Sequence, residues 1–207
     1  MIVRALGRVD YASGLALQEA ARERVLAGAP DELLLLEHDP VVTLGRRGGV
    51  VDHEALARLA TPVVTTHRGG LATWHGPGQL VGYPIVDLGR AHLGVPVFVR
   101  RLGALMLATA SALGLPDAVY DDRRPGIYRA GRKLGSVGLH IHKDVTMHGF
   151  ALNVDVDLAG FQAIVPCGFA GLDVSSLARE LGVPVRLADA VDAARRLAPG
   201  VLLSAPG

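Results

Sequence analysis

The single cysteine of the chain, Cys167, stands in a local sequence that favours reactivity. The ring of Pro166 fixes the backbone angle φ before the cysteine, and Gly168 allows a wide range of φ after it. A turn at this point would therefore expose the thiol in one reproducible position. A thiol becomes a nucleophile only where a nearby cation or the N–H groups of a helix N-terminus favour the thiolate. Cys167 therefore needs a partner, and without one it would be a small apolar side chain in the core.

Lysine is the residue type that could serve as this partner, and the chain holds only two, Lys133 and Lys143, among 21 basic residues. Lysine, unlike arginine, can be tuned to exchange a proton near neutral pH. Glycines surround Lys133 in residues 131–138 and leave room for a substrate. In a pair, Lys133 would stabilise the Cys167 thiolate or take its proton, and later return a proton to the leaving group. Because 34 residues separate the two, Lys133 as a solvated hairpin charge remains the alternative.

A glycine-rich segment, residues 68–79, predicts a ligand-binding loop. Its glycines would let the backbone approach a ligand closely, with Arg68 and His75 as polar anchors and Trp74 as an apolar wall. The spacing matches neither the phosphate-binding loop of nucleotide hydrolases nor the dinucleotide fingerprint. A glycine-rich hairpin with a surface aromatic residue is the alternative.

Three histidines are candidates for a metal site. His140 and His142 would share one strand face, and His148 could face them across a hairpin. Zinc sites usually bring further ligands at fixed spacing, and the chain has neither a cysteine pair nor an H-E-x-x-H motif. Exposed strand histidines are therefore favoured, and no metal or other cofactor is expected.

Composition narrows the class of protein. Half of the 207 residues are apolar and a fifth are charged, which excludes disorder as a description of the chain. A net charge of +1 provides no general field for nucleic acid or an anionic membrane, so neither is an expected partner. No apolar run approaches the roughly 20 residues of a membrane span, and the N-terminus lacks a signal-peptide pattern. With its lone cysteine, the chain is expected in the cytoplasm.

Helical and strand patterns alternate along the chain, which predicts an α/β (α+β) fold with a central mixed sheet flanked by helices. Its length favours a single domain over residues 1–207. Residues 32–37 form a continuous leucine run typical of a strand buried on both faces, with residues 41–44 as its expected partner. Strands are expected at 2–9, 32–37, 41–44, 63–66 and 80–88 and in an antiparallel meander at 127–129, 133–142 and 145–154; helices at 11–26, 52–59, 97–113 and 187–197; and helical turns at 158–164 and 176–181.

Five segments together resemble the lipoyl(octanoyl) transferase family: residues 37–46, 68–79, 131–133, 148–153 and 166–168. The resemblance implies a fold shared with lipoate and biotin protein ligases. It also implies transfer of an octanoyl group, without ATP or a cofactor, from octanoyl-acyl carrier protein to a lysine of a lipoyl domain. The acceptors implied are lipoyl domains of 2-oxoacid dehydrogenases and the glycine cleavage H protein, and the reaction is the first step of endogenous lipoate biosynthesis.

Matched residue by residue, Cys167 stands where the family has its thioester-forming nucleophile and Lys133 where it has the lysine that lowers the thiol pKa. The chain departs from the family's usual residues at Leu71, Trp74 and His140, and these changes are expected to alter the pocket or the docking of the carrier. The matched substrate-binding residues are Arg68, Gly69, Gly70, Leu71, Ala72, Thr73, Trp74, His75, Ser136, Val137, Gly138, Gly149, Phe150 and Ala151.

Two other functions remain open at this point. On the same fold, an ATP-dependent lipoate or biotin protein ligase would leave the thiol incidental. A non-catalytic module that binds carrier or lipoyl domains is a further possibility, although the presence of both Cys167 and Lys133 argues against it.

An acyl carrier protein is acidic, so local arginines are expected to dock it despite the near-zero net charge. The candidates are Arg46, Arg47, Arg123, Arg124, Arg129 and Arg132.

Overall fold

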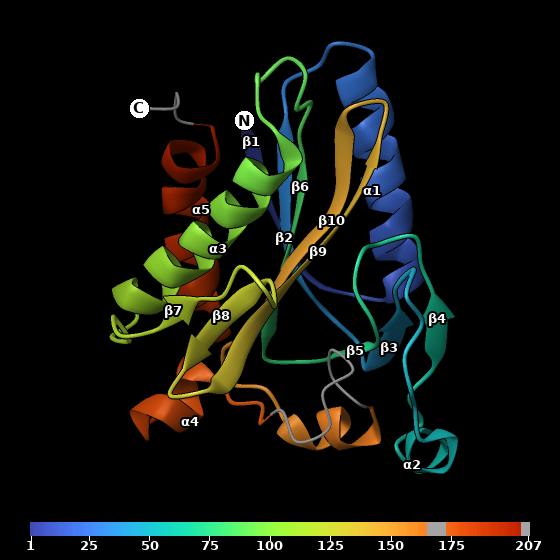
Figure 1. Ribbon diagram of the computed structural model, residues 1–207, viewed down its shortest axis with the longest axis vertical. Helices are drawn as coiled ribbons and strands as arrows, with labels where there is room; N and C mark the ends of the chain where they lie inside the picture. The colour runs from blue at the N-terminus through green and yellow to red at the C-terminus, as the bar shows by residue number, and fades with distance from the viewer. Residues whose placement is uncertain (165–172, 204–207) are drawn as a thin grey trace.

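A seven-stranded mixed sheet forms the centre of the computed structural model, which describes residues 1–164 and 173–203 (Figure 1). Its strand order is β1-β2-β6-β10-β9-β8-β7, with β1 and β2 parallel and every other pair antiparallel. The expected mixed sheet and the antiparallel meander β8-β9-β10 are thus confirmed. The strands are β1 (Ile2–Val9), β2 (Glu32–His38), β6 (Gln79–Ile85), β7 (Val119–Tyr120), β8 (Gly126–Arg129), β9 (Arg132–His142) and β10 (Val145–Asn153).

Helices cover both faces of this sheet. On one face lie α3 (Val95–Ala112) and α5 (Leu187–Leu202), packed against each other, and on the other lies α1 (Tyr11–Leu26) (Figure 1). Strand β2 is buried on both faces as predicted, since Leu33 and Leu35 join the core under α3 and α5 while Leu34 and Leu36 join a cluster on the opposite face. Each such buried leucine stabilises the fold by about 1.5–3 kcal/mol.

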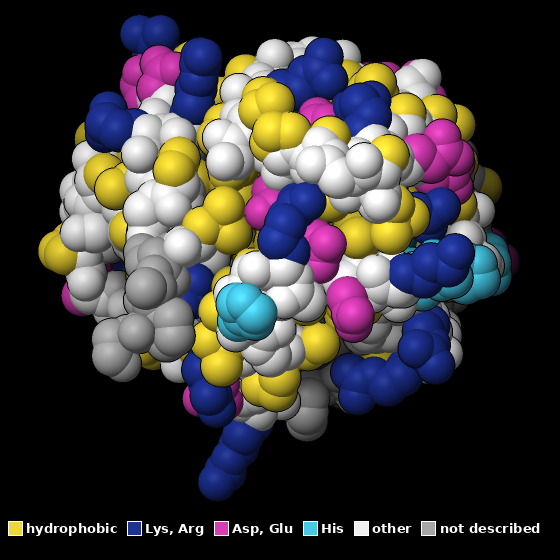
Figure 2. All heavy atoms as spheres, turned by 90° about the horizontal axis from the view of Figure 1, so that it is seen from above, with side chains coloured by type: hydrophobic (Ala, Val, Ile, Leu, Met, Phe, Trp, Pro, Cys, Tyr) yellow, Lys and Arg dark blue, Asp and Glu magenta, His cyan; other side chains and the backbone are white. Residues whose placement is uncertain are grey.

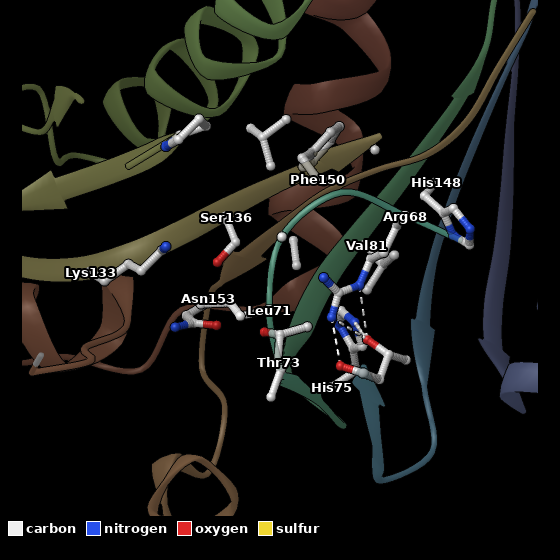
Figure 3. A pocket seen from close by; sticks show the side chains of 18 of the residues that line it. Arg68, Leu71, Thr73, His75, Val81, Lys133, Ser136, His148, Phe150 and Asn153 are labelled. Atoms are coloured by element: carbon white, nitrogen blue, oxygen red, sulfur yellow. Dashed lines mark hydrogen bonds between the residues drawn. The ribbon is translucent and has the colours of Figure 1, made fainter. Parts of the chain in front are cut away.

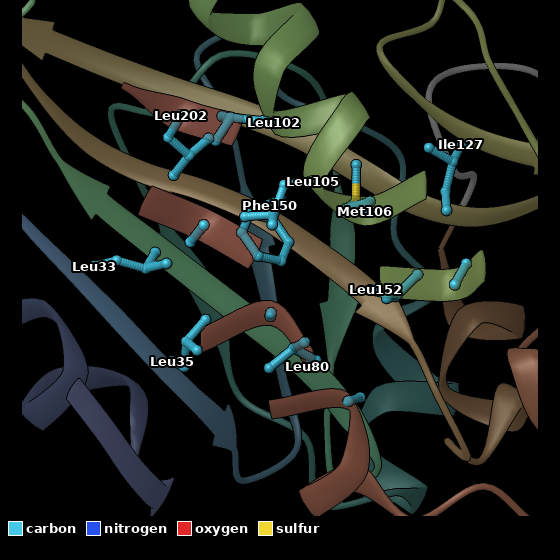
Figure 4. Packing of buried hydrophobic residues seen from close by; sticks show 14 of the residues in the cluster. Leu33, Leu35, Leu80, Leu102, Leu105, Met106, Ile127, Phe150, Leu152 and Leu202 are labelled. Carbon is cyan, nitrogen blue, oxygen red and sulfur yellow. The ribbon is translucent and has the colours of Figure 1, made fainter. Parts of the chain in front are cut away.

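The main core lies between the sheet and α3. Leu102, Leu105 and Met106 of this helix are fully buried, and they pack with Phe150 and Leu152 of β10 (Figure 4). Among the helices of the described residues, only α3 has the length and apolar composition of a membrane span. A core helix meets the same description, and its packing on α5 and the sheet accounts for that composition.

A second, three-stranded sheet of order β4-β3-β5 corrects the expected pairing of residues 41–44. Strand β3 (Val41–Leu44) does not pair with β2, because β1 and β6 already occupy both edges of β2. It pairs instead with β4 (Val63–Thr65) in parallel and with β5 (Thr73–His75) antiparallel. Strand β5 was not expected, since it lies inside the glycine-rich segment.

The remaining elements follow the sequence signals with small shifts. Asp52 caps α2 (His53–Arg58) by accepting a hydrogen bond from the N–H of Ala55 at 2.9 Å. The helical turns appear as η1 (Leu158–Ala163) and α4 (Leu177–Leu181). Helix α5 continues past residue 197 and contains Pro199, while its Asp192, Arg195 and Arg196 face solvent as expected. Over the face shown in Figure 2, acidic and basic side chains are interspersed, which fits the small net charge.

A tight approach at Gly78, in the turn before β6, fixes the end of β10. Its φ is +83°, and a Cβ at this position would overlap the carbonyl group of Asp155. The carbonyl oxygen of Gly78 accepts hydrogen bonds from the N–H groups of Val154 and Asp155, and its own N–H donates to Glu37 at 2.9 Å. No larger residue fits without moving the end of β10.

We therefore expect Gly78→Ala to lower the free energy of unfolding by about 3 kcal/mol, through both backbone strain and steric overlap. Gly28 is the matched control, because its φ is +94° but no atom lies within 4 Å of a Cβ built there. Gly28→Ala should cost only about 1 kcal/mol, which is the strain alone. Urea unfolding of both variants measures the difference, and equal losses would contradict the proposed overlap at Gly78.

Candidate active site

A cavity of about 260 Å³ opens between the two sheets (Figure 3). Its wall comes from the segment after β4, from β5 and β6, and from the centre of the β9-β10 pair. Thirteen of the residues expected to take part in catalysis or substrate binding line it, although their individual roles stay predictions. They are Arg68, Gly70, Leu71, Ala72, Thr73, His75, Lys133, Ser136, Val137, Gly138, Gly149, Phe150 and Ala151.

Two of the expected substrate-binding residues do not line this cavity, and Cys167 lies outside the described residues. Trp74 is buried in a second core beside Phe161, at a ring-centroid distance of 5.5 Å. The expectation of an apolar wall at Trp74 is therefore wrong, because side chains alternate along β5 and Thr73 and His75 take the cavity side. Gly69 uses its N–H to donate to the carbonyl oxygen of Leu139 at 2.8 Å, which fixes the loop to β9.

Arg68 anchors the glycine-rich loop from inside. Its side chain is buried, and its guanidinium donates to the carbonyl oxygen of Thr43 at 2.6 Å and to the Thr43 hydroxyl at 2.8 Å. A further bond reaches the carbonyl oxygen of Gly69 at 2.9 Å. Arg68 thus ties β3 to the loop and brings a fixed positive charge to the cavity wall.

Aromatic side chains line the end of the cavity that lies farthest from Lys133. Tyr83 donates its hydroxyl hydrogen bond to Nε2 of His38 at 2.7 Å, because Nδ1 of His38 donates to the carbonyl oxygen of Val9 at 2.7 Å. Burial raises the pKa of Tyr11 to about 12 and that of Tyr83 above its usual range, so both phenols stay neutral. The phenol rings at this end of the cavity are therefore uncharged, and the Arg68 guanidinium lies near them.

His148 contributes a further uncharged ring at this end. Its backbone lies in the left-handed region, with a φ of +57°, and its N–H donates to Oε1 of the buried Gln18 at 2.7 Å. Burial, reinforced by the nearby charge of Arg68, lowers the pKa of His148 to about 3. The ring packs edge-on against Tyr83 at a centroid distance of 6.2 Å.

A chain of buried polar side chains crosses the sheets beside the cavity, and the sequence analysis did not identify it. His75 donates from Nδ1 to Oε1 of Gln79 at 2.7 Å, and Gln79 donates to Oδ1 of Asn153 at 2.9 Å. Asn153 in turn donates to the carbonyl oxygen of Ser175 at 2.9 Å. Burial lowers the pKa of His75 to about 3, so this imidazole stays neutral. The sequence did hold one sign of this chain: Gln79 and Asn153 stand at the ends of apolar strands, where a buried amide needs a hydrogen-bond partner.

Lys133 is buried at the opposite end of the cavity from His148 (Figure 3). The segment that follows the undescribed residues holds its backbone: the Lys133 N–H donates to the carbonyl oxygen of Asp173, and the Ser175 N–H donates to that of Lys133, both at 2.9 Å. Its ammonium nitrogen lies 5.5 Å from the centre of the Tyr128 ring. Lys133 is therefore buried inside the fold, and the solvated-hairpin alternative is wrong.

Residues on both sides of the undescribed stretch border the same cavity. Phe161 lies before it and Val174 after it, and both line the wall. Ile164 bridges to Val51 and Val174 bridges to Lys133, so the described chain on each side is paired. Described residues that precede and follow Cys167 in the sequence therefore contribute to the same wall.

The histidine cluster does not form a metal site within the described part of the chain, where no three side chains of His, Asp, Glu or Cys are grouped to hold an ion. His140 pairs across the strands with Met147, whereas His148 pairs with Leu139. The ring of His140 lies 5.8 Å from that of His67 instead. Of the three departures from the family's usual residues, only Leu71 reaches the cavity wall.

Comparison with known proteins shows to which family this chain belongs. The family model of the lipoyl protein ligase A/B catalytic domain matches residues 10–196. A relative from Mycobacterium sp. (strain KMS), named octanoyltransferase, is 47% identical over 197 residues, which cover 92% of this chain and 81% of that protein. The chain belongs to this family. It is accordingly an enzyme of the acyltransferase class, as the resemblance implied.

Solved structures of related folds confirm the architecture expected for the family. Lipoate-protein ligase A bound with ATP superposes with a TM-score of 0.79 at 18% identity, covering 97% of this chain and 85% of that one. Biotin protein ligase from Aquifex aeolicus gives a TM-score of 0.54 at 13% identity, with 98% of this chain and 68% of that one covered. Identities this low show the shared fold alone.

The two cavity histidines make stability depend on pH. Both are neutral in the folded protein with pKa values of about 3, whereas an unfolded histidine binds a proton below about pH 6.5. Because the unfolded state binds more protons, stability falls as the pH drops below 6.5, by about 1.4 kcal/mol per histidine and pH unit. His148→Asn, which tolerates the left-handed backbone, should reduce this slope by about one proton.

Urea unfolding between pH 7.5 and pH 5 measures this slope. The exposed His142 supplies the control, and His142→Asn should leave the slope unchanged. An unaltered pH dependence in His148→Asn would contradict the neutral, buried state of this ring.

Proposed function

We propose that this enzyme transfers an octanoyl group from octanoyl-acyl carrier protein to a lysine of a lipoyl domain, through a thioester on Cys167 assisted by Lys133. One observation carries the proposal. The buried Lys133 side chain stands at one end of a cavity whose other end carries uncharged aromatic side chains, and Phe161 and Val174, which lie before and after Cys167 in the sequence, line the same cavity. The octanoyltransferase relatives at 44–47% identity support the acyl group.

The cavity suits an alkyl chain. Val81 and Ala151, which pack together, border it on one face of the sheet, and Leu71 closes one side (Figure 3). Each methylene transferred from water to such a wall contributes about 0.8 kcal/mol. An octanoyl chain in this slot would point its thioester carbonyl toward Lys133 and its methyl end toward Tyr83 and His148.

The first half of the reaction moves the acyl group onto the enzyme. Before the donor reacts, the Lys133 amine has taken the proton of the Cys167 thiol, which leaves an ammonium beside a thiolate, and this thiolate attacks the carbonyl carbon of the carrier thioester. The carbon–sulfur bond to the carrier then breaks, and the carrier sulfur leaves with the proton that Lys133 returns. Backbone N–H groups near the reacting carbonyl are the natural donors to the tetrahedral oxyanion.

The second half transfers the acyl group to the acceptor. The neutral amine of the acceptor lysine attacks the Cys167 thioester, an amide bond forms, and the cysteine leaves as the new leaving group. Lys133 receives the amine proton and returns it to sulfur. The proposed acceptors are lipoyl domains of 2-oxoacid dehydrogenases and the glycine cleavage H protein.

The proposal treats the chain as one catalytic unit. Both sheets contribute to the wall of the cavity, so neither alone would hold the substrate. We place the reaction in the cytoplasm, where a reducing environment keeps a lone nucleophilic thiol free. Because the fold is shared with a lipoate-protein ligase that binds ATP, an ATP-dependent ligase is the competing function.

Intact-mass spectrometry after mixing the enzyme with octanoyl-acyl carrier protein, without ATP and without acceptor, tests the mechanism directly. We expect one octanoyl increment on the wild-type enzyme and none on Cys167→Ala. Lys133→Arg should acylate at least about a hundredfold more slowly, because arginine keeps its positive charge but does not exchange the proton. Lys143→Arg, at the other lysine of the chain, is the matched control and should behave as wild type.

The outcomes separate the candidate functions. Full acylation of Cys167→Ala would disprove the nucleophile, and full activity of Lys133→Arg would disprove its role in proton transfer. Product formation that requires ATP would favour the ligase. Carrier binding without any transfer would favour the binding module.

A further inference from the structure

The wall of the cavity is strongly biased toward positive charge. Arg47, Arg68, Arg123, Arg124 and Lys133 all line it, and no Asp or Glu among the described residues does so. This bias is local, since the chain as a whole has 21 basic and 20 acidic residues. An anionic group that enters the mouth would therefore meet a positive field without a compensating carboxylate in the wall.

Tertiary contacts divide the six arginines that were candidates for carrier docking. Arg132 makes a bidentate pair with the buried carboxylate of Glu180, with both bonds at 2.7 Å, and Arg129 bonds Asp117 at 3.0 Å. Arg124 pairs with Asp121 at 2.8 Å. These three arginines are neutralised within the fold, so their charge is largely unavailable to a partner.

Arg47 and Arg123 differ from these three. Both side chains are exposed, both line the cavity, and neither has an ion-pair partner within residues 1–164 and 173–203. Their backbones are nevertheless held: the Arg47 N–H donates to the carbonyl oxygen of Gly70 at 3.2 Å, and the Arg123 N–H donates to the Asp121 carboxylate at 2.9 Å. Two ordered loops, one attached to each sheet, thus present a guanidinium at the rim.

We propose that Arg47 and Arg123 form an anion-binding rim that holds the phosphate of a phosphopantetheine thioester donor. The inference rests on the proposed function, because a carrier delivers its acyl group on such an arm. With the acyl chain in the slot and the thioester near Lys133, the rest of the arm leaves through the mouth. Guanidinium groups bind phosphate oxygens through paired, charge-assisted hydrogen bonds.

The position of the two arginines favours the arm over the acidic surface of the carrier protein. A protein surface would contact the outside of the molecule, whereas Arg47 and Arg123 line the cavity itself. Arg46, the immediate neighbour of Arg47, is also exposed but does not line the cavity. Arg46 is therefore a control that distinguishes an effect of general surface charge from an effect of charge at the rim.

Binding of two inert donor analogues tests the rim. The probes are octanamide analogues of pantetheine and of 4′-phosphopantetheine, in which an amide replaces the thioester so that no transfer occurs. Calorimetry on the wild-type enzyme should show about tenfold tighter binding of the phosphorylated probe, an advantage that shrinks at high salt. The double variant Arg47→Ala/Arg123→Ala should lose this advantage and keep the affinity for the pantetheine probe, while Arg46→Ala should retain both.

Each alternative outcome is decisive. An equal advantage of phosphate in wild type and double variant, or none in wild type, would overturn the rim. An equal loss of affinity for both probes in the double variant would mean that the two arginines maintain the shape of the pocket and do not bind the phosphate. Slower acylation of the double variant by octanoyl-acyl carrier protein, with unchanged acylation by octanoyl-pantetheine, would support the carrier arm as the source of the phosphate. If Cys167 is never acylated but the phosphate advantage holds, the proposed function fails and the rim stands.

Discussion

A directional chain of hydrogen bonds connects the two sheets, and the shape of the cavity depends on it. The chain starts at the Arg68 guanidinium, which donates to the Thr43 hydroxyl, and that hydroxyl lies 3.4 Å from Nε2 of His75. Each later member donates a hydrogen bond to the next, so the chain runs from the Arg68 guanidinium at one end to the Glu180 carboxylate at the other. Breaking one link would leave a buried polar group unsatisfied, at a cost of about 1–3 kcal/mol. The later members are Gln79, Asn153, Ser175 and Glu180.

This chain also explains why the end of the cavity near Lys133 is well defined. Glu180 is anchored by Arg132 and by the Ser175 hydroxyl at 2.6 Å, and the hydrogen bonds from Arg132 in particular lower the pKa of Glu180 to about 2. Ser175 in turn pairs with the backbone of Lys133. The carboxylate therefore stays charged at every physiological pH, and it fixes the strand that carries Lys133 without contacting the cavity itself.

Local patterns predicted most of the fold because each reports a neighbour close in sequence. The period of two in residues 133–142 and 145–154 gave the meander, and the leucine run at 32–37 gave the buried strand. The pairing of β3 depended on which strands already flank β2, which no local pattern records. Trp74 was assigned to the site because it lies among glycines, yet its place in strand β5 directs its side chain away from the cavity and into a second hydrophobic core. The hydrogen-bond chain was missed because residues bonded to one another in it lie up to 74 positions apart in the sequence.

The arginines illustrate the same limit for charge. Sequence alone presents six equivalent candidates for binding an acidic partner, and one of them, Arg124, has a carboxylate three residues away that marks it as paired. Glu180 lies 48 residues from Arg132 and 51 from Arg129, so its effect on both appears only in the fold. Because an ion pair within the fold removes most of the field of each member, the charge that a donor meets is set by which arginines lack such a neighbour. The distribution of buried carboxylates, more than the number of arginines, thus determines where an anion can bind.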